Sequence, residues 1–237
     1  MLNISHLTKT YGDKKAVDDL SLHIAPGEIY GFIGHNGAGK TTTIKSVVGI
    51  LQFDEGEITI DGTSLKDDPI ACKKKIAYIP DNPDLYEFMS GIKYLNFIAD
   101  IFGVGAEERQ ERIKKYADMF ELTEDLAQPI SAYSHGMKQK LAILAAWIHN
   151  PKLIIMDEPF VGLDPKASFL LKEMMRDVCA AGGAIFFSTH VLEVAEKLCD
   201  KVAIIKGGKL IRSGTMESVQ GDDSLEEVFL ELEGEQC

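Results

Sequence analysis

The stretch "IYGFIGHNGAGKTT", residues 29–42, decides the fold of this 237-residue chain. Its first five residues form a short apolar run, which is typical of a buried strand. A glycine-rich segment follows at once, and the sequence "TTTIKSVVGI" after it is typical of a helix. This order of strand, loop and helix predicts an α/β domain.

The loop itself, "GHNGAGKT" at 34–41, matches the pattern G-x-x-x-x-G-K-[ST] in the setting that this pattern requires. Its glycines let backbone N–H groups surround phosphates, and the helix N-terminus adds a favourable dipole. Lys40 is predicted to reach the β- and γ-phosphates, and the Thr41 hydroxyl to ligate Mg²⁺. The alternative, a glycine turn with a surface lysine, does not explain the strand and helix on either side. The predicted nucleoside triphosphate site includes Gly34, Asn36, Gly37, Ala38, Gly39, Lys40, Thr41 and Thr42.

A second apolar run, "LIIMD" at 153–157, supplies the acidic groups that such a site needs. Asp157 would hold Mg²⁺ through water, and Glu158 would polarise the attacking water as a general base. The alternative is a simple helix start, but the four apolar residues before Asp157 favour a strand. His190, in "FFSTH", lies at another strand end, where ligands gather in an open α/β sheet. A lone histidine is more often structural, so this residue is the weaker candidate.

Strands and helices alternate on both sides of a helical middle section. Strands are predicted at 2–7, 16–24, 29–33, 56–65, 74–80, 153–157 and 184–188, and a hairpin at 202–212. Helices are predicted at 41–50, 106–122, 166–180 and 191–198. In the helix at 106–122, one face carries Ile113, Tyr116, Ala117 and Phe120. We therefore expect core parts at 1–85 and 151–215, a helical subdomain at 86–150 that ends in a signature helix, and an acidic helical tail at 216–237.

The tail contains eight acids and no Lys or Arg, and we interpret it as a solvated helix face with a frayed end. "SLEE" at 224–227 is a capping box, which opens a short helix whose apolar face is Leu225, Val228, Phe229 and Leu232.

The composition excludes several classes of protein. The chain has 25 Lys and Arg against 37 Asp and Glu, a net charge of −12, which argues against a broad nucleic-acid surface. Four cysteines without metal-ligand spacing indicate reduced thiols in a cytosolic protein. No secretory signal and no apolar run of about 20 residues is present, so we expect another chain to supply any membrane span.

Taken in order, four segments resemble the nucleotide-binding subunits of the ATP-binding cassette (ABC) transporters. They are "LTKTYGDKKAVDDLSLHIAPGEIYGFIGHNGAGKTT", "YSHGMKQKL", "LIIMDEPFVGLDP" and "STH". The resemblance implies a P-loop NTPase core, with a mixed sheet and an antiparallel β subdomain, plus a helical subdomain. It implies ATP and Mg²⁺ as cofactors.

The same resemblance implies a head-to-tail dimer in which each site is shared between two chains. Ser134 and Gly136 would contact the γ-phosphate held by the partner's loop, and Asp164 would line the interface. Tyr11 would stack on adenine, and His190 would contact the γ-phosphate.

This chain departs from the family pattern in its signature, in the loop after "AYIP", and at Val161, which replaces the first residue of "SGLDP". The signature is usually Leu-Ser-Gly-Gly-Gln, whereas here residues 133–137 read "YSHGM", a variant similar to the branch that serves exporters. Asp81 stands where the family usually has a glutamine that touches Mg²⁺ and senses the membrane subunit. A carboxylate can still ligate Mg²⁺, but it is one methylene shorter and adds negative charge beside Asp157.

These observations predict an ATPase subunit that drives a separate membrane permease from the cytoplasmic face of the membrane, and analogy with the family branch predicts an export system. The helical insert would carry the groove for the permease. The dimer would form with itself or with a paralogue, and no nucleic acid is expected. Two alternatives are a soluble cassette ATPase acting on ribosome or nucleic-acid complexes, and a nucleotide sensor with negligible turnover.

Overall fold

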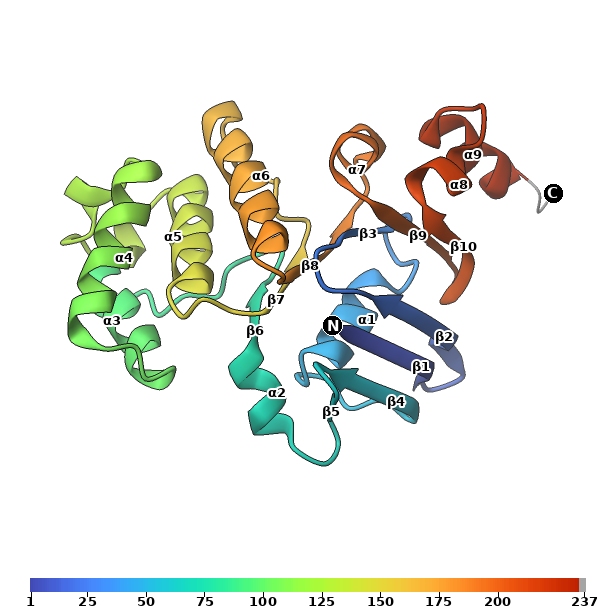
Figure 1. Ribbon diagram of the computed structural model, residues 1–237, viewed down its shortest axis with the longest axis horizontal. Coiled ribbons are helices and arrows are strands. Elements are labelled where there is room, and N and C mark those ends of the chain that lie inside the picture. Colours follow the sequence, from blue (N-terminus) through green and yellow to red (C-terminus); the bar gives the residue numbers. More distant parts are fainter. Residues whose placement is uncertain (235–237) are drawn as a thin grey trace.

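The computed structural model describes residues 1–234 (Figure 1). Its strands are β1 (Leu2–Tyr11), β2 (Lys14–Ile24), β3 (Ile29–Ile33), β4 (Glu55–Ile60), β5 (Thr63–Ser64), β6 (Ile76–Ile79), β7 (Leu153–Asp157), β8 (Ala184–Thr189), β9 (Lys201–Lys206) and β10 (Lys209–Thr215). Its helices are α1 (Lys40–Val47), α2 (Pro69–Lys75), α3 (Gly91–Ile101), α4 (Ala106–Met119), α5 (His135–Trp147), α6 (Pro165–Ala180), α7 (Leu192–Leu198), α8 (Met216–Gln220) and α9 (Leu225–Gly234). Two 3₁₀ turns, η1 (Thr123–Asp125) and η2 (Ile130–Ala132), precede α5.

The larger sheet carries the predicted phosphate loop. Within the described residues its strand order is β10-β9-β3-β8-β7-β6. Neighbouring strands from β9 to β6 are parallel, whereas β10 runs antiparallel to β9. Every residue of β3 and β7 is buried, which explains their uninterrupted apolar sequences. Because β3, β7 and β8 are parallel, their carboxyl ends meet at one edge, where the predicted site residues follow.

The smaller sheet, in the order β2-β1-β4-β5, is antiparallel throughout. One apolar cluster joins it to α1 and to the larger sheet, and this cluster includes Ile4, Ile44 and Phe186. The mixed sheet with an antiparallel β subdomain is therefore confirmed.

Helices α3, α4 and α5 lie together at one end of the molecule (Figure 1). The predicted apolar face of α4 is confirmed, because Ile113, Ala117 and Phe120 are buried and Tyr116 packs beside them. Helix α5 buries one continuous run from Leu141 to Trp147 against the same cluster. No helix in the described part of the chain is both long enough and apolar enough to cross a bilayer.

The sequence prediction was wrong about the boundaries of some elements. Helix α2 was missed: Asp68 caps it by accepting from the Ala71 N–H, and Pro69 opens it. Consequently the strand expected at 74–80 begins only at Ile76. The strand expected at 56–65 ends at Ile60, before the turn that the pair Asp61-Gly62 predicts, and the short strand β5 follows that turn. Strand β1 runs on to Tyr11 through irregular register, which hid its alternation.

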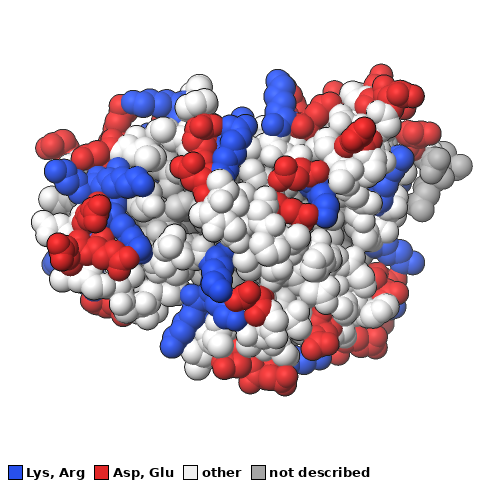
Figure 2. Space-filling model, viewed as in Figure 1, with Lys and Arg blue, Asp and Glu red and all other residues white. Residues whose placement is uncertain are grey.

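The acidic tail is not only a solvated helix. Val219 of α8 and Leu225, Val228 and Phe229 of α9 are buried in the main apolar cluster. The acids at 217, 222, 223, 226, 227 and 231 are exposed, and Figure 2 shows acidic side chains gathered over this end of the molecule. The capping box is confirmed, because the Ser224 N–H donates to Glu227 and the Glu227 N–H donates to the Ser224 hydroxyl. Two residues considered in the sequence, Glu235 and Cys237, lie outside the described residues.

Candidate functional site

A pocket of about 340 Å³ opens at the carboxyl edge of the larger sheet. It brings predicted residues together from four distant segments of the chain. Its lining residues are Tyr11, Lys14, Ala16, His35, Asn36, Gly37, Gly39, Lys40, Thr41, Thr42, Asp81, Asp157 and Glu158. Lys14, Ala16 and His35 were not predicted. Lys14 and Ala16 follow Tyr11 closely, and His35 lies inside the loop motif. Their closeness to predicted residues could have indicated them.

The phosphate loop passes so close to other backbone that two of its glycines have no substitute. A Cβ at Gly34 would lie 2.5 Å from the Ile205 carbonyl oxygen, and one at Gly39 would lie 2.5 Å from the Ala16 carbonyl oxygen. Gly39 also has a φ of +114°, which favours glycine. The Ala38 carbonyl accepts from the Gly208 N–H at 2.8 Å. The turn between β9 and β10 therefore supports the loop from behind.

Helix α1 presents an N-terminus suited to an anion. Gly39 is its N-cap and offers no side chain, and the first turn contains no acidic residue. The first N–H groups of such a helix lack intrahelical partners and attract negative charge. Lys40 is only 6% exposed, and its Nζ donates to the Gly34 carbonyl at 2.5 Å. The loop thus holds its lysine inside the pocket.

A hydroxyl and a carboxylate meet at the base of the pocket. Thr41 Oγ1 donates to Asp157 Oδ2 at 2.7 Å, and the Ser188 hydroxyl donates to the other oxygen of Asp157. Among the described residues, no three His, Cys, Asp or Glu side chains are grouped to hold a metal alone. This donor set still fits Mg²⁺, which takes oxygen ligands and commonly uses one or two carboxylates together with substrate phosphates.

Ser188 is a site residue that the sequence prediction missed. It lies directly opposite Asp157 in the parallel pairing of β7 and β8. Its hydroxyl contacts Asp157 and also accepts from the Glu158 N–H at 3.1 Å. The signal was present in "FFSTH", where Ser188 is the second-to-last residue of β8 and stands two residues before the predicted His190.

Glu158 adopts an unusual backbone conformation that directs its side chain into the pocket. Its φ is +49°, an uncommon value for a residue other than glycine and one that clusters at functional sites. Glu158 Oε2 lies 2.9 Å from His190 Nδ1, and Oε1 lies 3.6 Å from Lys40 Nζ. Oε1 forms no hydrogen bond with any described residue. A carboxylate oxygen held in this way is free to accept a proton from a water molecule.

Asp81 and Tyr11 lie on the rim of the same pocket. Asp81 is exposed and faces the pocket that Asp157 and Glu158 also line. Burial, followed by the charges of Asp157 and Asp81, raises the pKa of Tyr78. Tyr11 ends β1 with its ring half exposed and the Lys9 ammonium 5.5 Å from its centre. An exposed ring at the mouth of a pocket offers a flat surface for stacking.

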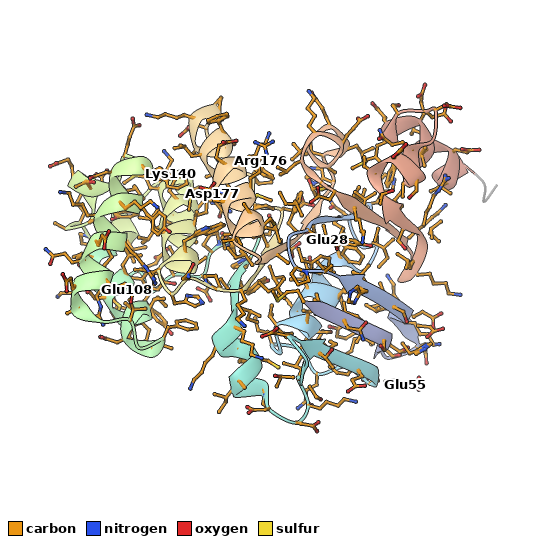
Figure 3. All side chains as sticks on the ribbon, viewed as in Figure 1. Glu28, Glu55, Glu108, Lys140, Arg176 and Asp177 are labelled. Atoms are coloured by element: carbon orange, nitrogen blue, oxygen red, sulfur yellow. The ribbon has the colours of Figure 1, made fainter. Side chains whose placement is uncertain are left out.

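The structure does not bring Ser134, Gly136 or Asp164 to the phosphate loop of the same chain. Ser134 caps α5 by accepting from the Met137 N–H at 3.3 Å. Asp164 caps α6 by accepting from the Ala167 N–H at 2.8 Å. Its carboxylate also pairs at 2.8 Å with the ammonium of Lys140, a residue of α5 that is labelled in Figure 3. The hydrogen bond from Lys140 lowers the pKa of Asp164.

The signature segment and the segment after Glu158 are nevertheless packed together. A Cβ on Gly136 would lie 2.9 Å from the Gly162 carbonyl oxygen. Gln139 of α5 is fully buried, and its amide donates to the Pro159 carbonyl at 3.3 Å. Sequence reasoning missed Gln139, although a lone glutamine before a run of apolar helical residues was a signal.

Comparisons with known proteins agree with this arrangement. Residues 17–161 match the family model described as ABC transporter. The chain is 33% identical over 237 residues to the ABC-type transporter ATP-binding protein EcsA of Bacillus subtilis strain 168, covering 98% of this chain and 96% of that protein. It is 34% identical to the linearmycin resistance ATP-binding protein LnrL of the same organism, covering 91% and 69%.

Two solved structures extend the comparison to three dimensions. An ATP-binding subunit of an ABC transporter is similar with a TM-score of 0.95 and 35% identity, over 98% of this chain and 99% of that one. A dimeric, post-hydrolysis state of the ATP-binding cassette MJ0796, bound to ADP and Pi, is similar with a TM-score of 0.83 and 25% identity, over 91% and 99%.

Proposed function

This chain belongs to the ABC transporter family as one of its ATP-binding and ATP-hydrolysing subunits, and we propose that it drives a separate membrane-spanning permease. Its cofactors are ATP and Mg²⁺. The fold, family and enzyme class predicted from the sequence are confirmed, and the alternative of a sensor with negligible turnover is set aside.

The roles that we propose for the pocket residues follow from their contacts. The loop amides and the N-terminus of α1 bind the phosphates, and the Lys40 ammonium turns from the Gly34 carbonyl toward them. Thr41 and Asp157 hold Mg²⁺, with Asp81 as a further contact; the ion neutralises charge on the phosphates.

Two further residues would act on the water that attacks the γ-phosphate. Glu158 accepts its proton, and His190 holds the Glu158 carboxylate in place through their 2.9 Å contact while facing the γ-phosphate. The Tyr11 ring stacks on adenine. The positive φ of Glu158 supports this role, because a strained conformation there aims the carboxylate at the pocket.

We also propose that two chains close head to tail around ATP, with themselves or with a paralogue. Ser134 and Gly136 would then bind the phosphate held by the partner, and Asp164 would line the interface. Their separation from their own phosphate loop supports this arrangement. The Ser134 hydroxyl accepts one hydrogen bond as a helix cap and keeps its own hydrogen available for a phosphate oxygen.

The observation that carries the permease proposal is a groove beside the loop after β6. This groove has a volume of about 410 Å³, and its apolar lining comes from the core and from α3 and α5, including Ile50, Tyr94 and Phe102. Segment 80–85 lines the groove, and Asp81 of the same segment lines the nucleotide pocket. A helix seated in the groove would therefore act directly on the site.

An aromatic cluster enlarges the apolar surface beside the groove. Phe88 is 82% exposed, and the Tyr86 ring lies between it and Phe97, with ring centres 5.9 and 5.6 Å apart. We assign this surface to an amphipathic cytoplasmic helix of the permease, because exposed apolar surface of this kind marks a partner site. The signature "YSHGM" and the similarity to a resistance protein support export as the direction, and a place on the cytoplasmic face of the membrane follows.

A pull-down tests this proposal. Tagged Glu158→Gln protein is recovered from detergent-solubilised source membranes with Mg-ATP, and its companions are identified by mass spectrometry. We expect a multi-span membrane protein whose recovery is lost in a Glu158→Gln/Phe88→Asp double variant. The matched control is Glu158→Gln/Phe169→Asp, since Phe169 is also exposed but lies on α6 outside the groove. Recovery of ribosomes or DNA-bound proteins, or equal capture by both double variants, would overturn the proposal.

A further inference from the structure

The last two helices form a docked unit on the core, which we call the C-terminal helix pair (α8 and α9, residues 216–234). Val219, Leu225 and Val228 are each at most 1% exposed, so apolar burial holds the pair in place. The Gln220 amide donates to Glu196 of α7 at 2.5 Å. The Lys206 ammonium donates to the Leu232 carbonyl at 3.1 Å, which ties α9 to the end of β9.

From this docked position, Phe229 reaches the phosphate loop. Its ring meets the His35 ring edge-on, with centres 4.8 Å apart. Phe229 is 7% exposed, whereas His35 is an exposed residue that lines the nucleotide pocket. The geometry is that of a favourable aromatic pair, with one member fixed by the core and the other belonging to the loop.

A displacement of His35 would be transmitted to the residues that hold the phosphates. The His35 carbonyl accepts from the Ala38 N–H at 3.1 Å, and Lys40 Nζ lies 3.4 Å from the same oxygen. The loop conformation and the position of the lysine therefore both depend on where His35 sits. Gly34 and Gly37 lie close to His35 in the loop and carry no side chain by which a neighbour could hold it.

We propose that Phe229 is a positioning residue for nucleotide binding, which holds the phosphate loop in its binding conformation through His35. The C-terminal helix pair also contacts α7, which begins two residues after His190, through the bond between Gln220 and Glu196. It thereby joins the loop that binds the phosphates to the segment that carries His190. This inference rests on the proposed role of the phosphate loop.

The central test measures the affinity for a fluorescent ADP analogue with Mg²⁺ in Phe229→Ala and in the parent protein. If the contact holds the loop, its loss reduces the fraction of binding-competent protein, and the apparent Kd rises by about two- to tenfold. The neighbouring Leu230 is 62% exposed, so Leu230→Ala is the matched control and leaves the Kd unchanged. Phe229→Leu keeps the apolar bulk and the fold, and its Kd lies between those of the parent and Phe229→Ala.

Hydrogen exchange separates positioning from a general effect on stability. In nucleotide-free Phe229→Ala, we expect faster exchange at the amides of residues 34–41, with unchanged exchange in the strands β7 and β8. A uniform increase over the whole chain would show that Phe229 supports only the fold, and it would overturn the proposal.

A double-mutant cycle then tests the contact itself. Because His35 also lines the pocket, His35→Ala has an effect of its own, which cancels in the cycle with Phe229→Ala. We expect the double variant to bind no more weakly than His35→Ala alone, whereas additive effects would overturn the proposal. Lys40→Ala is measured beside them: if it loses binding while Phe229→Ala does not, only this inference fails. Unchanged binding in Lys40→Ala would instead remove the role assigned to the loop.

Discussion

The phosphate-loop region consists of the loop at 34–42 together with Asp157, Glu158 and His190, and the signature region consists of residues 133–139 together with Asp164. The two regions satisfy their polar groups in different ways. In the phosphate-loop region, polar side chains from distant segments contact one another, as in Thr41 with Asp157 and Glu158 with His190. In the signature region, Ser134 and Asp164 cap the helices that they begin, although Asp164 also pairs with Lys140 of α5. The first region is assembled by the fold, and the second is locally stable and exposed. The exposed surface of the signature region supports the proposed contact with a second chain.

The difference also appears as backbone strain, whereas buried polar atoms without partners among the described residues occur in both regions, because Gln139 Oε1 of α5 is one as well. Glu158 has a positive φ, and within the described chain its Oε1 and the Tyr78 hydroxyl are buried without a hydrogen bond. Such features cost stability and persist where function requires them. The caps at Ser134 and Asp164 have no such cost. Substitutions should therefore affect chemistry most in the first region and association most in the second.

The largest effect is expected on turnover in Glu158→Gln. Loss of the general base should reduce the steady-state ATPase rate by about 10²- to 10⁴-fold. Binding of ATP should be spared, because the amide keeps the size of the side chain, so the variant should retain ATP in a closed dimer. Phosphate release and nucleotide retention are measured on the same preparation. A wild-type rate in this variant would contradict the assignment of Glu158 as the base.

The next effect is on nucleotide affinity, and it separates the two regions directly. Lys40→Ala removes a buried charged donor and should weaken ATP binding by about 10- to 150-fold. Ser134→Arg should keep ATP binding by a single chain but lose turnover, since we propose that Ser134 serves the site of the partner. Equilibrium binding at low protein concentration, together with ATPase assays, measures both.

Mixing the two variants provides the control for the shared site. A mixed dimer of Lys40→Ala and Ser134→Arg contains one site in which both contributing halves are intact. The mixture should therefore regain part of the turnover that each variant lacks alone. If the mixture stays inactive while both variants fold and dimerise, the two halves do not come from different chains as proposed.

Much of the phosphate-loop region was predictable from the sequence because its chemical groups lie in short motifs. The loop at 34–41 and the acids after β7 each follow a buried strand, and parallel strands bring such ends together. Ser188 and Gln139 stand out in the sequence as polar residues beside apolar runs, but they were missed because their partners depend on strand register and helix packing. The docking of α9 on the loop was missed for the same reason: its capping box and apolar face predicted the helix, but not its neighbour.

A smaller effect is expected at the ion pair between Lys140 and Asp164. The hydrogen bond from Lys140 lowers the pKa of Asp164 in the folded state, so the pair stabilises the fold above the unfolded pKa. This contribution is lost as the pH falls through the lower, folded pKa. Since the Asp164 side chain is about half exposed, Lys140→Met should cost at most about 1 kcal/mol at pH 7. Urea unfolding at pH 7 and at strongly acidic pH measures the difference, which should vanish in acid.

The smallest effect is expected on the stability of Tyr78→Phe, and it is the one substitution expected to stabilise the fold. The hydroxyl is buried without a hydrogen bond to any described residue, and the pKa of Tyr78 is raised by burial and by the nearby carboxylates. Removing an unpaired buried hydroxyl relieves a desolvation cost, so the free energy of unfolding should stay constant or rise by up to about 1 kcal/mol. Phe is matched in shape, and urea unfolding measures the change. A loss of more than 1 kcal/mol would show that the hydroxyl is satisfied, and that the phosphate-loop region is less strained than its contacts indicate.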